Sequence, residues 1–304
     1  MIPFILRRLV GLVVVLLVVF LLTFALAHAV PGGPFQSERV LPDVVKENFE
    51  RRYRLDLPYH EQAYYMLRDY ARGDLGQSMK MDVEINDVVA QGLPISAALG
   101  ALALTFAFTV GLAAGILSAV RRGTRSDFLL MSTAALGIAL PNFVVAGFAI
   151  LLFVFMIPIF PAGGWGTLRQ LILPGLCLGA PYAAYVARIA RTGMLDVLGQ
   201  DHIRTARAKG LSPWSVVMRH ALPTAMLPVI SFLGPAVAGV LTGSPVVEQI
   251  FAIPGMGWHF VQAAFNRDIT MAMGLVMVYT VLLYTMNFLV DLSYGLLDPR
   301  VEYK

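Results

Sequence analysis

The chain has 304 residues, of which 58% are hydrophobic and only 14% are charged, and its formal net charge is +4. Because soluble domains carry about 25% charged residues, this composition excludes an ordinary soluble domain and indicates an integral membrane protein. Cys177 is the single cysteine, which excludes an intramolecular disulfide and a thiolate metal cluster. The basic residues outside one long loop lie at the ends of apolar runs, so they reflect membrane topology and we expect no nucleic-acid partner.

Residues 1–30 predict the first membrane span. Arg7 and Arg8 precede an apolar run, residues 9–27, that is long enough to cross a hydrocarbon core of about 30 Å. The run is longer than the apolar region of a signal peptide, although Ala27-His28-Ala29 resembles a cleavage site. We therefore expect an uncleaved span whose N-terminus is held in the cytoplasm by the two arginines.

Residues 31–94 are polar and predict a small helical segment outside the membrane. Two helices are expected, at residues 42–56 and 59–72. In the second, Ala63, Met66, Leu67 and Tyr70 share one face, and Gly73 follows where a helix end favours positive φ. The segment is too short for an enzyme domain.

Five further apolar runs follow, at residues 95–120, 128–157, 171–187, 222–250 and 272–296. Every short connection on the expected cytoplasmic side is basic. The predicted fold class is an all-α integral membrane protein with six transmembrane helices and both termini in the cytoplasm. Residues 95–297 form the five-helix core, which contains a cytoplasmic loop at 188–222, and residues 298–304 form a cytoplasmic tail.

Polar positions inside these runs are the candidates for a translocation path. Pro141 frees a backbone carbonyl near mid-span, so Pro141-Asn142 predicts a kink that faces a cavity. Ser231 and Thr242 are further candidates, with bonds back to their own helix as the alternative. Asp291 near the last span end is expected to form a buried pair with an N-terminal arginine or a neighbouring backbone, and not a proton relay.

The loop at 188–222 is the longest polar interruption in the C-terminal half. Residues 203–209 contain good helix formers, Gly210 suits the position after a helix end, and Ser212-Pro213 suits the start of a second helix. Trp214, Val217, Met218 and Ala221 predict one apolar stripe on that second helix. The loop is either a contact surface for a partner or an amphipathic segment on lipid headgroups.

The run from Arg204 to Gly210, followed after nine residues by His220-Ala221-Leu222-Pro223, resembles the EAA loop of ATP-binding-cassette importer permeases. Ala206, Gly210, Leu222 and Pro223 match that pattern, whereas Arg204, Thr205 and His220 depart from its Glu, Ala and Ile. The run from Ile203 to Leu211 is similar to the peptide-permease branch. The resemblance implies that the residues contacting an ATPase are Asp201, Arg204, Thr205, Ala206, Arg207, Gly210 and Leu211.

Residues 248–257 resemble the outer segment ExIFxxPGxG that lies between the last two spans of this family. The matching residues are Glu248, Pro254, Gly255 and Gly257. The resemblance implies a re-entrant piece that lines a cavity or packs in protein, and the alternative is a plain extracellular turn. We expect Gly255 to adopt a backbone conformation that β-branched residues avoid.

Catalytic motifs are missing from the sequence. It contains no G-x-x-x-x-G-K-[ST] phosphate loop, no H-E-x-x-H and no G-x-S-x-G, and its five histidines are scattered. We therefore expect a transport subunit that is not an enzyme, with no metal or cofactor of its own.

The chain resembles, nearly end to end, the first permease subunit of oligopeptide importers in the binding-protein-dependent peptide/nickel family. The resemblance implies a multi-pass protein of the bacterial cytoplasmic membrane. Its implied partners are a second permease subunit, two ATPase subunits that hold ATP and Mg, an extracytoplasmic peptide-binding protein, the peptide and membrane lipid. Alternatives are a sibling importer for dipeptides, nickel or glutathione, and an ATP-independent channel or secondary carrier.

Overall fold

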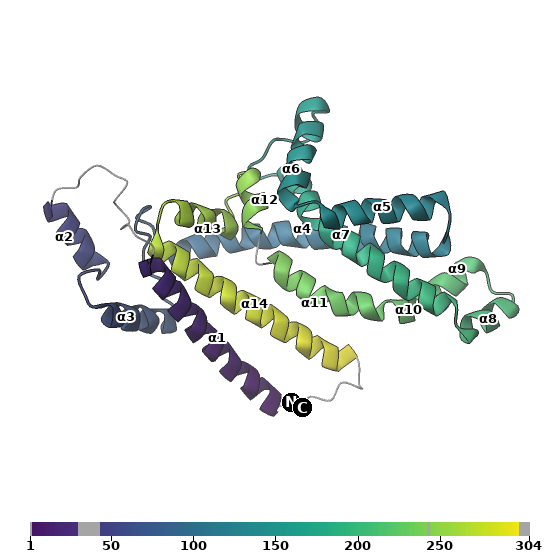
Figure 1. The fold of residues 1–304 in the computed structure, drawn as a ribbon, viewed down its shortest axis with the longest axis horizontal. Helices are drawn as coiled ribbons and strands as arrows, with labels where there is room; N and C mark the ends of the chain where they lie inside the picture. Colours follow the sequence, from purple (N-terminus) through teal and green to yellow (C-terminus); the bar gives the residue numbers. More distant parts are fainter. Residues whose placement is uncertain (1, 30–42, 242–243, 298–304) are drawn as a thin grey trace.

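A computed structural model describes residues 2–29, 43–241 and 244–297 of the chain (Figure 1). Within these ranges all regular secondary structure is helical, apart from one isolated bridge between Gln77 and Glu84. The elements are α1 (Ile2–Ala29), α2 (Asp43–Arg52), α3 (Tyr59–Ala71), α4 (Ile85–Val120), α5 (Arg125–Ala139), α6 (Asn142–Ile150), the π-helix η1 (Leu151–Met156), α7 (Leu168–Leu198), α8 (Asp201–Ala208), α9 (Pro213–Ser215), the π-helix η2 (Val216–Ala221), α10 (Leu222–Ala225), α11 (Leu227–Leu241), α12 (Pro245–Ile250), α13 (Met256–Phe265) and α14 (Ile269–Leu297).

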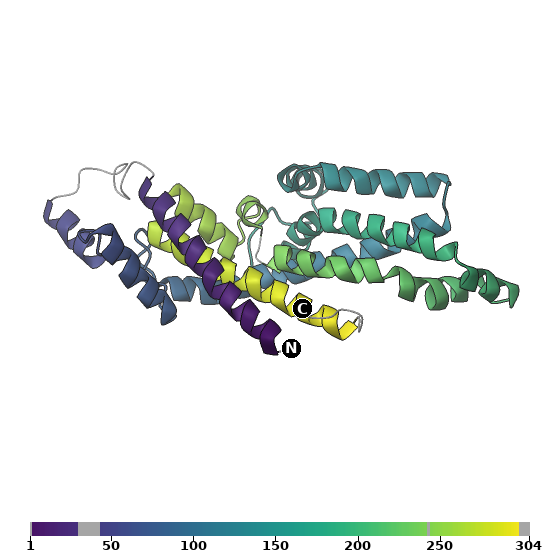
Figure 2. The same cartoon turned by 60° about the horizontal axis from the view of Figure 1, so that its bottom comes forward.

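The molecule is elongated, and different elements occupy its two ends. Figures 1 and 2 show α2 and α3 at one end, α8 and α9 at the other, and α4, α5, α7 and α11 running between them. In the described ranges, α1, α4, α7 and α14 are long and apolar enough to cross a membrane. Two bent pairs, α5 with α6–η1 and α9–α10 with α11, raise the number to six when each counts as one span.

Small residues bring α4 and α7 close together. A Cβ atom added at Gly111 would lie 2.5 Å from the carbonyl oxygen of Ala183, and one at Gly115 would lie 2.5 Å from that of Ala187. Glycines on the contacting face of a helix let two helix backbones approach to van der Waals distance in a lipid environment. The two helices therefore form the tightly packed centre of the molecule.

The first and last helices are joined at the chain termini. Arg8 forms an ion pair with Asp291, and the Tyr284 hydroxyl donates to the Arg8 carbonyl oxygen over 2.7 Å. The expected pairing of Asp291 with an N-terminal arginine is confirmed, but the pair is half-buried and not buried as predicted. The tail at 298–304 lies outside the described residues.

The cap, defined as α2 and α3 with their connection, contacts α1 through α3. Met66, Leu67 and Tyr70 of α3 lie against Phe20 and Phe24 of α1, so the predicted apolar face of this helix is confirmed. Gly73 follows α3 with φ +79°, also as predicted. The helix expected at 42–56 is shorter and ends at Arg52.

Several span boundaries differ from those predicted, and α4 begins at Ile85 where the span was expected from residue 95. α7 continues to Leu198, whereas the sequence suggested a loop from residue 188, because Arg188 and Arg191 remain helical. The chain turns by 111° between α5 and α6, which confirms the kink at Pro141-Asn142. The run expected as one helix at 222–250 bends by 54° after α10, its long helix α11 ends at Leu241, and α12 is a separate helix.

Candidate functional site

The coupling segment, defined as residues 199–221, begins with α8 and a well-formed helix end. Gly210 has φ +76°, as predicted, and its N–H donates to the carbonyl oxygen of Arg207 over 3.0 Å. The Leu211 N–H reaches the carbonyl oxygen of Ala206 at 3.4 Å. This pair of bonds is a Schellman motif, which requires a residue that tolerates positive φ. Gly210 therefore sets the direction in which the chain leaves α8.

The second half of the coupling segment starts at Ser212, whose hydroxyl accepts from the Ser215 N–H over 3.3 Å. The predicted cap and the proline in the first turn are both confirmed. The predicted apolar stripe is confirmed only in part, because Ala221 is buried and Val217 and Met218 are half-buried, whereas Trp214 is 73% exposed. Residues from Val216 onward form a π-helix, whose wider turn also brings Val216 to the buried face.

The underside of the coupling segment is a hydrophobic base. Ile203 and Ala206 of α8 pack with Val216 and Ala221 of η2 against Met194 of α7. Ala206 is only 5% exposed, so its small size serves contact with this chain's own helices. This corrects the expectation that Ala206 lies at a partner's surface. The base holds the segment firmly on the ends of α4 and α7.

The outer face of the coupling segment is exposed and mostly basic. Of the residues implied as ATPase contacts, Asp201, Arg204, Thr205, Arg207 and Leu211 are exposed, as is Gly210. Arg204 Nη1 lies 3.3 Å from Asp201 Oδ1, an exposed pair that contributes little to stability. Figure 1 places α8 and α9 at the extremity of the molecule. The segment therefore presents charged side chains on a rigid support.

The outer segment, defined as residues 244–265, is organised by one buried carboxylate. Glu248 is completely buried, and its Oε1 accepts from the Ser96 hydroxyl of α4 over 2.8 Å. Its Oε2 accepts from the Trp258 N–H over 3.0 Å, and Ser96 Oγ accepts from the Met256 N–H over 3.0 Å. The Met256 and Trp258 N–H groups lie in the first turn of α13, where free N–H groups and the helix dipole favour a negative charge. Burial raises the pKa of Glu248, which these hydrogen bonds oppose.

Close contact explains the two glycines of the outer segment. A Cβ atom added at Gly255 would lie 2.3 Å from Glu248 Oε2 and 2.5 Å from Ser96 Oγ. One added at Gly257 would lie 2.8 Å from the Cα atom of Pro245. Gly255 itself has φ −86° and ψ 177°, so the predicted special backbone conformation is wrong. The segment packs against α4 and is more than a plain turn.

Ser96 was missed by the sequence analysis. It is one hydroxyl in a long apolar run, and its partner Glu248 lies 152 positions away. A hydroxyl that follows Pro94 inside a span gives no local sign of such a partner. Pro254, the remaining predicted residue of the outer segment, is exposed in the turn before α13.

The proposed path residues are placed only in part. Pro141 is exposed and Asn142 is half-buried at the bend between α5 and α6. The Ser231 hydroxyl donates to the carbonyl oxygen of Leu227 over 3.1 Å, the bond back to its own helix that was the alternative to pore lining. Thr242 lies outside the described residues.

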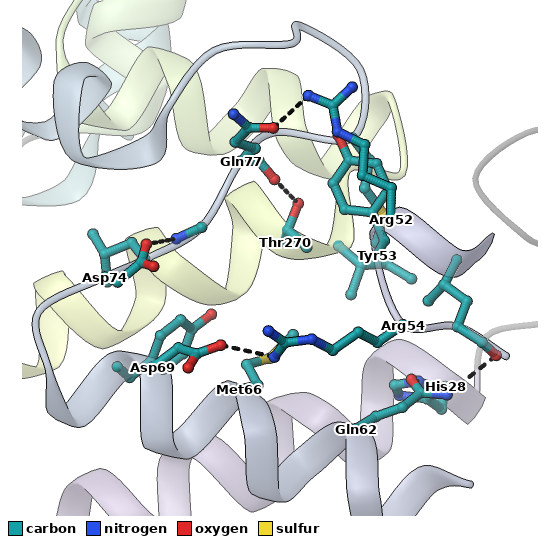
Figure 3. A pocket seen from close by; sticks show the side chains of 16 residues that line it. His28, Arg52, Tyr53, Arg54, Gln62, Met66, Asp69, Asp74, Gln77 and Thr270 are labelled. Atoms are coloured by element: carbon teal, nitrogen blue, oxygen red, sulfur yellow. Dashed lines mark hydrogen bonds and ion pairs between the residues drawn. The ribbon is translucent and has the colours of Figure 1, made fainter. Parts of the chain in front are cut away.

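A cavity of about 230 Å³ lies between the cap and the chain entering α4 and α14 (Figure 3). Charged side chains that line the cavity bond to other lining residues, with Arg54 Nη1 2.8 Å from Asp69 Oδ2 and Arg52 Nη2 2.5 Å from Gln77 Oε1. Burial alone would raise the pKa of Asp69, but hydrogen bonds from Arg54 and Arg68 hold it below its usual value. The Arg52–Gln77 contact therefore joins the cap to the chain that enters α4.

Comparison with known proteins identifies relatives over the whole chain. A family model described as "Binding-protein-dependent transport system inner membrane component" matches residues 111–303. The oligopeptide transport system permease protein OppB of Haemophilus influenzae is 41% identical, with all of both chains covered. The dipeptide transport system permease protein DppB of Bacillus subtilis is 42% identical over 98% of this chain and 97% of its own length.

Solved structures share the fold at lower sequence identity. An inward-facing form of the MetNI methionine ABC transporter superposes with a TM-score of 0.57 at 18% identity, covering 69% of this chain and 96% of the other. An amino acid ABC transporter crystallised with histidines gives a TM-score of 0.54 at 19% identity, covering 69% and 94%. Both comparisons support the arrangement of the helices described above.

Proposed function

The chain belongs to the family of binding-protein-dependent transport system inner membrane components, and from this premise we propose that it imports short peptides as one permease subunit of an ATP-binding-cassette transporter. Its relatives at 40–42% identity are named as oligopeptide or dipeptide permeases. The observation that carries the coupling part of the proposal is the exposed basic coupling segment on its hydrophobic base. ATP hydrolysis is assigned to partner ATPase subunits, since the sequence has no phosphate loop.

The proposed topology has six spans, with the coupling segment and both termini in the cytoplasm and the cap outside. It is supported by the two bent helix pairs, each counted as one span, and by the arginines at the end of the molecule where α8 lies. Reporters fused at Arg122, Gln200 and Lys304 are expected to read inside, and one at Glu61 outside. An inside signal at Glu61 would overturn the orientation of α1 and everything built on it.

The proposed partners are a second permease subunit, two ATPase subunits with ATP and Mg, and an extracytoplasmic binding protein. Closure of the ATPases on ATP moves the coupling segment, and the spans then open outward to receive peptide. Such transmission requires that the segment make different contacts in the two states, because equal contacts shift no equilibrium. Retention of ATPase subunits by the complex in mild detergent tests the assembly.

The solute class is tested by uptake into liposomes that contain the complete complex and its binding protein. We expect ATP-dependent uptake of peptides and competition among them, with oligopeptides preferred to dipeptides. Preference for dipeptides would place the chain with the DppB relative, and uptake of nickel or glutathione alone would refute the peptide assignment. Flux through the isolated chain without ATPases would favour a channel or secondary carrier.

A further inference from the structure

A buried ion pair joins α5 to α7 at the end of the molecule that carries the coupling segment. Asp127, in the first turn of α5, is only 6% exposed. Arg191 of α7 donates from Nε to Asp127 Oδ1 and from Nη2 to Asp127 Oδ2, each over 2.9 Å. A bidentate guanidinium–carboxylate pair fixes the relative orientation of its two groups as well as their distance.

The same carboxylate also holds the turn between α4 and α5. It accepts a hydrogen bond from the Ser118 hydroxyl in the last turn of α4, and one from the Gly123 N–H over 2.9 Å. Gly123 has φ +78°, so the turn has the shape that aims its N–H at Asp127. One side chain thus connects α4, the turn and α7, with four hydrogen bonds to its two oxygens.

Apart from Asp127, this turn is held by local hydrogen bonds, in which the N–H and the hydroxyl of Thr124 both donate to the Arg121 carbonyl oxygen. Its residues from Arg121 to Arg125 are all exposed. Beyond it, α5 meets α7 through apolar packing, in which Ala134 lies against Ala184 and Ala187, with Met131 and Ile138 beside them. The bonds of Asp127 add a directional, bidentate contact to this non-directional packing of α5 on α7.

The pair lies directly beside the base of the coupling segment. Met194, one turn after Arg191 on α7, is fully buried against Ile203 and Ala206 of α8. Ala119, the neighbour of Ser118, belongs to the same cluster. A displacement of the coupling segment therefore reaches Arg191 through a continuous packed path.

We propose that Asp127 and Arg191 are positioning residues that make the α4–α5 turn and α5 move together with the coupling segment. The bend of 111° at Pro141 then carries that motion into α6. The source of the motion rests on the proposed function, whereas the mechanical link between turn and segment does not.

The link is tested by spin-label distances in the purified complex. Labels are placed at Arg122→Cys in the turn and Gln200→Cys at the start of α8, both exposed positions. Cys177 is 3% exposed and does not compete for the label. We expect one narrow distance distribution that is the same with and without ATP. Asp127→Asn, which keeps the side-chain shape, is expected to broaden it and to lower peptide carried per ATP several-fold while ATPase subunits stay bound.

Two further variants keep the test decisive. Arg191→Lys retains the charge but loses the bidentate geometry, and it is expected to broaden the distribution even if Asp127→Asn fails to fold. Asp196→Asn removes another, exposed carboxylate of α7 and is expected to change neither readout. A distance that shifts with ATP in the unmodified pair of labels would overturn the proposal. So would narrow distributions and normal coupling in both Asp127→Asn and Arg191→Lys. Because the nucleotide-free distances need no transport, failure of the peptide assignment alone would leave this result unaffected.

Discussion

Substitution of Gly210 by valine changes the backbone at the end of α8 and leaves the charged side chains of the coupling segment unaltered. Gly210 has φ +76°, and an added Cβ would meet nothing within 4 Å. The cost is therefore backbone strain and not collision, about 1–3 kcal/mol for a β-branched residue held in the left-handed region. If that strain is relieved by unwinding the Schellman end of α8, the docking-competent form becomes rarer by about 5- to 150-fold.

The assay is titration of the purified permease complex with ATPase subunits, alongside peptide uptake. Gly210→Val is expected to weaken ATPase binding within that range and to abolish uptake while all spans stay inserted. Gly210→Asn should lose far less, because Asn tolerates positive φ. Gly199→Ala is the matched control, since Gly199 begins the same segment with φ −83°. Unchanged binding and uptake in Gly210→Val would refute the claim that this helix end shapes the docking surface.

Three other substitutions have distinct expected outcomes. Ala206→Glu should destabilise the coupling segment by about 3 kcal/mol or more, because it puts a charge into this chain's own core; protease resistance of the segment equal to that of the parent would contradict this. Arg204→Glu should weaken ATPase binding more than Arg204→Ala, with the difference shrinking at high salt; equal affinities would argue against a carboxylate partner. Gly255→Ala should break a hydrogen bond to Glu248 and lower the free energy of unfolding by about 1.5–3 kcal/mol, measured by thermal unfolding. Gly147→Ala, which has open space around it, should not do so. Equal unfolding temperatures for the two variants would show that the outer segment accommodates the added methyl group.

The sequence predictions that the structure confirms depend on residues close together in the chain. Gly73, Gly210 and Ser212 each act through their own backbone or the next few residues, so their roles follow from residue type and position. The kink at Pro141 is local in the same sense. Long apolar runs likewise predict helices, because length and composition alone determine whether a helix can cross a membrane.

The wrong or missing predictions depend on contacts between distant residues. Arg191 was assigned to a loop. Its partner Asp127 lies 64 positions earlier, so no local sequence pattern indicates the pair. Ala206 is buried by helices whose packing is set elsewhere in the chain. Gly255 was explained by its backbone, whereas the close approach of Glu248 is what excludes a side chain there. Pattern and propensity do not contain this information until the fold brings the groups together.

The central claim, that the outer face of the coupling segment contacts an ATPase, is tested most directly by site-specific photocrosslinking. A photoreactive amino acid at exposed Arg207 is expected to form an adduct with an ATPase subunit, in a yield that changes when ATP is added. The same group at Ile203, which is fully buried in the base, is expected to crosslink only within the chain. Adducts of position 207 with lipid alone, in a complex that contains the ATPases, would contradict the account and assign the segment to the membrane surface.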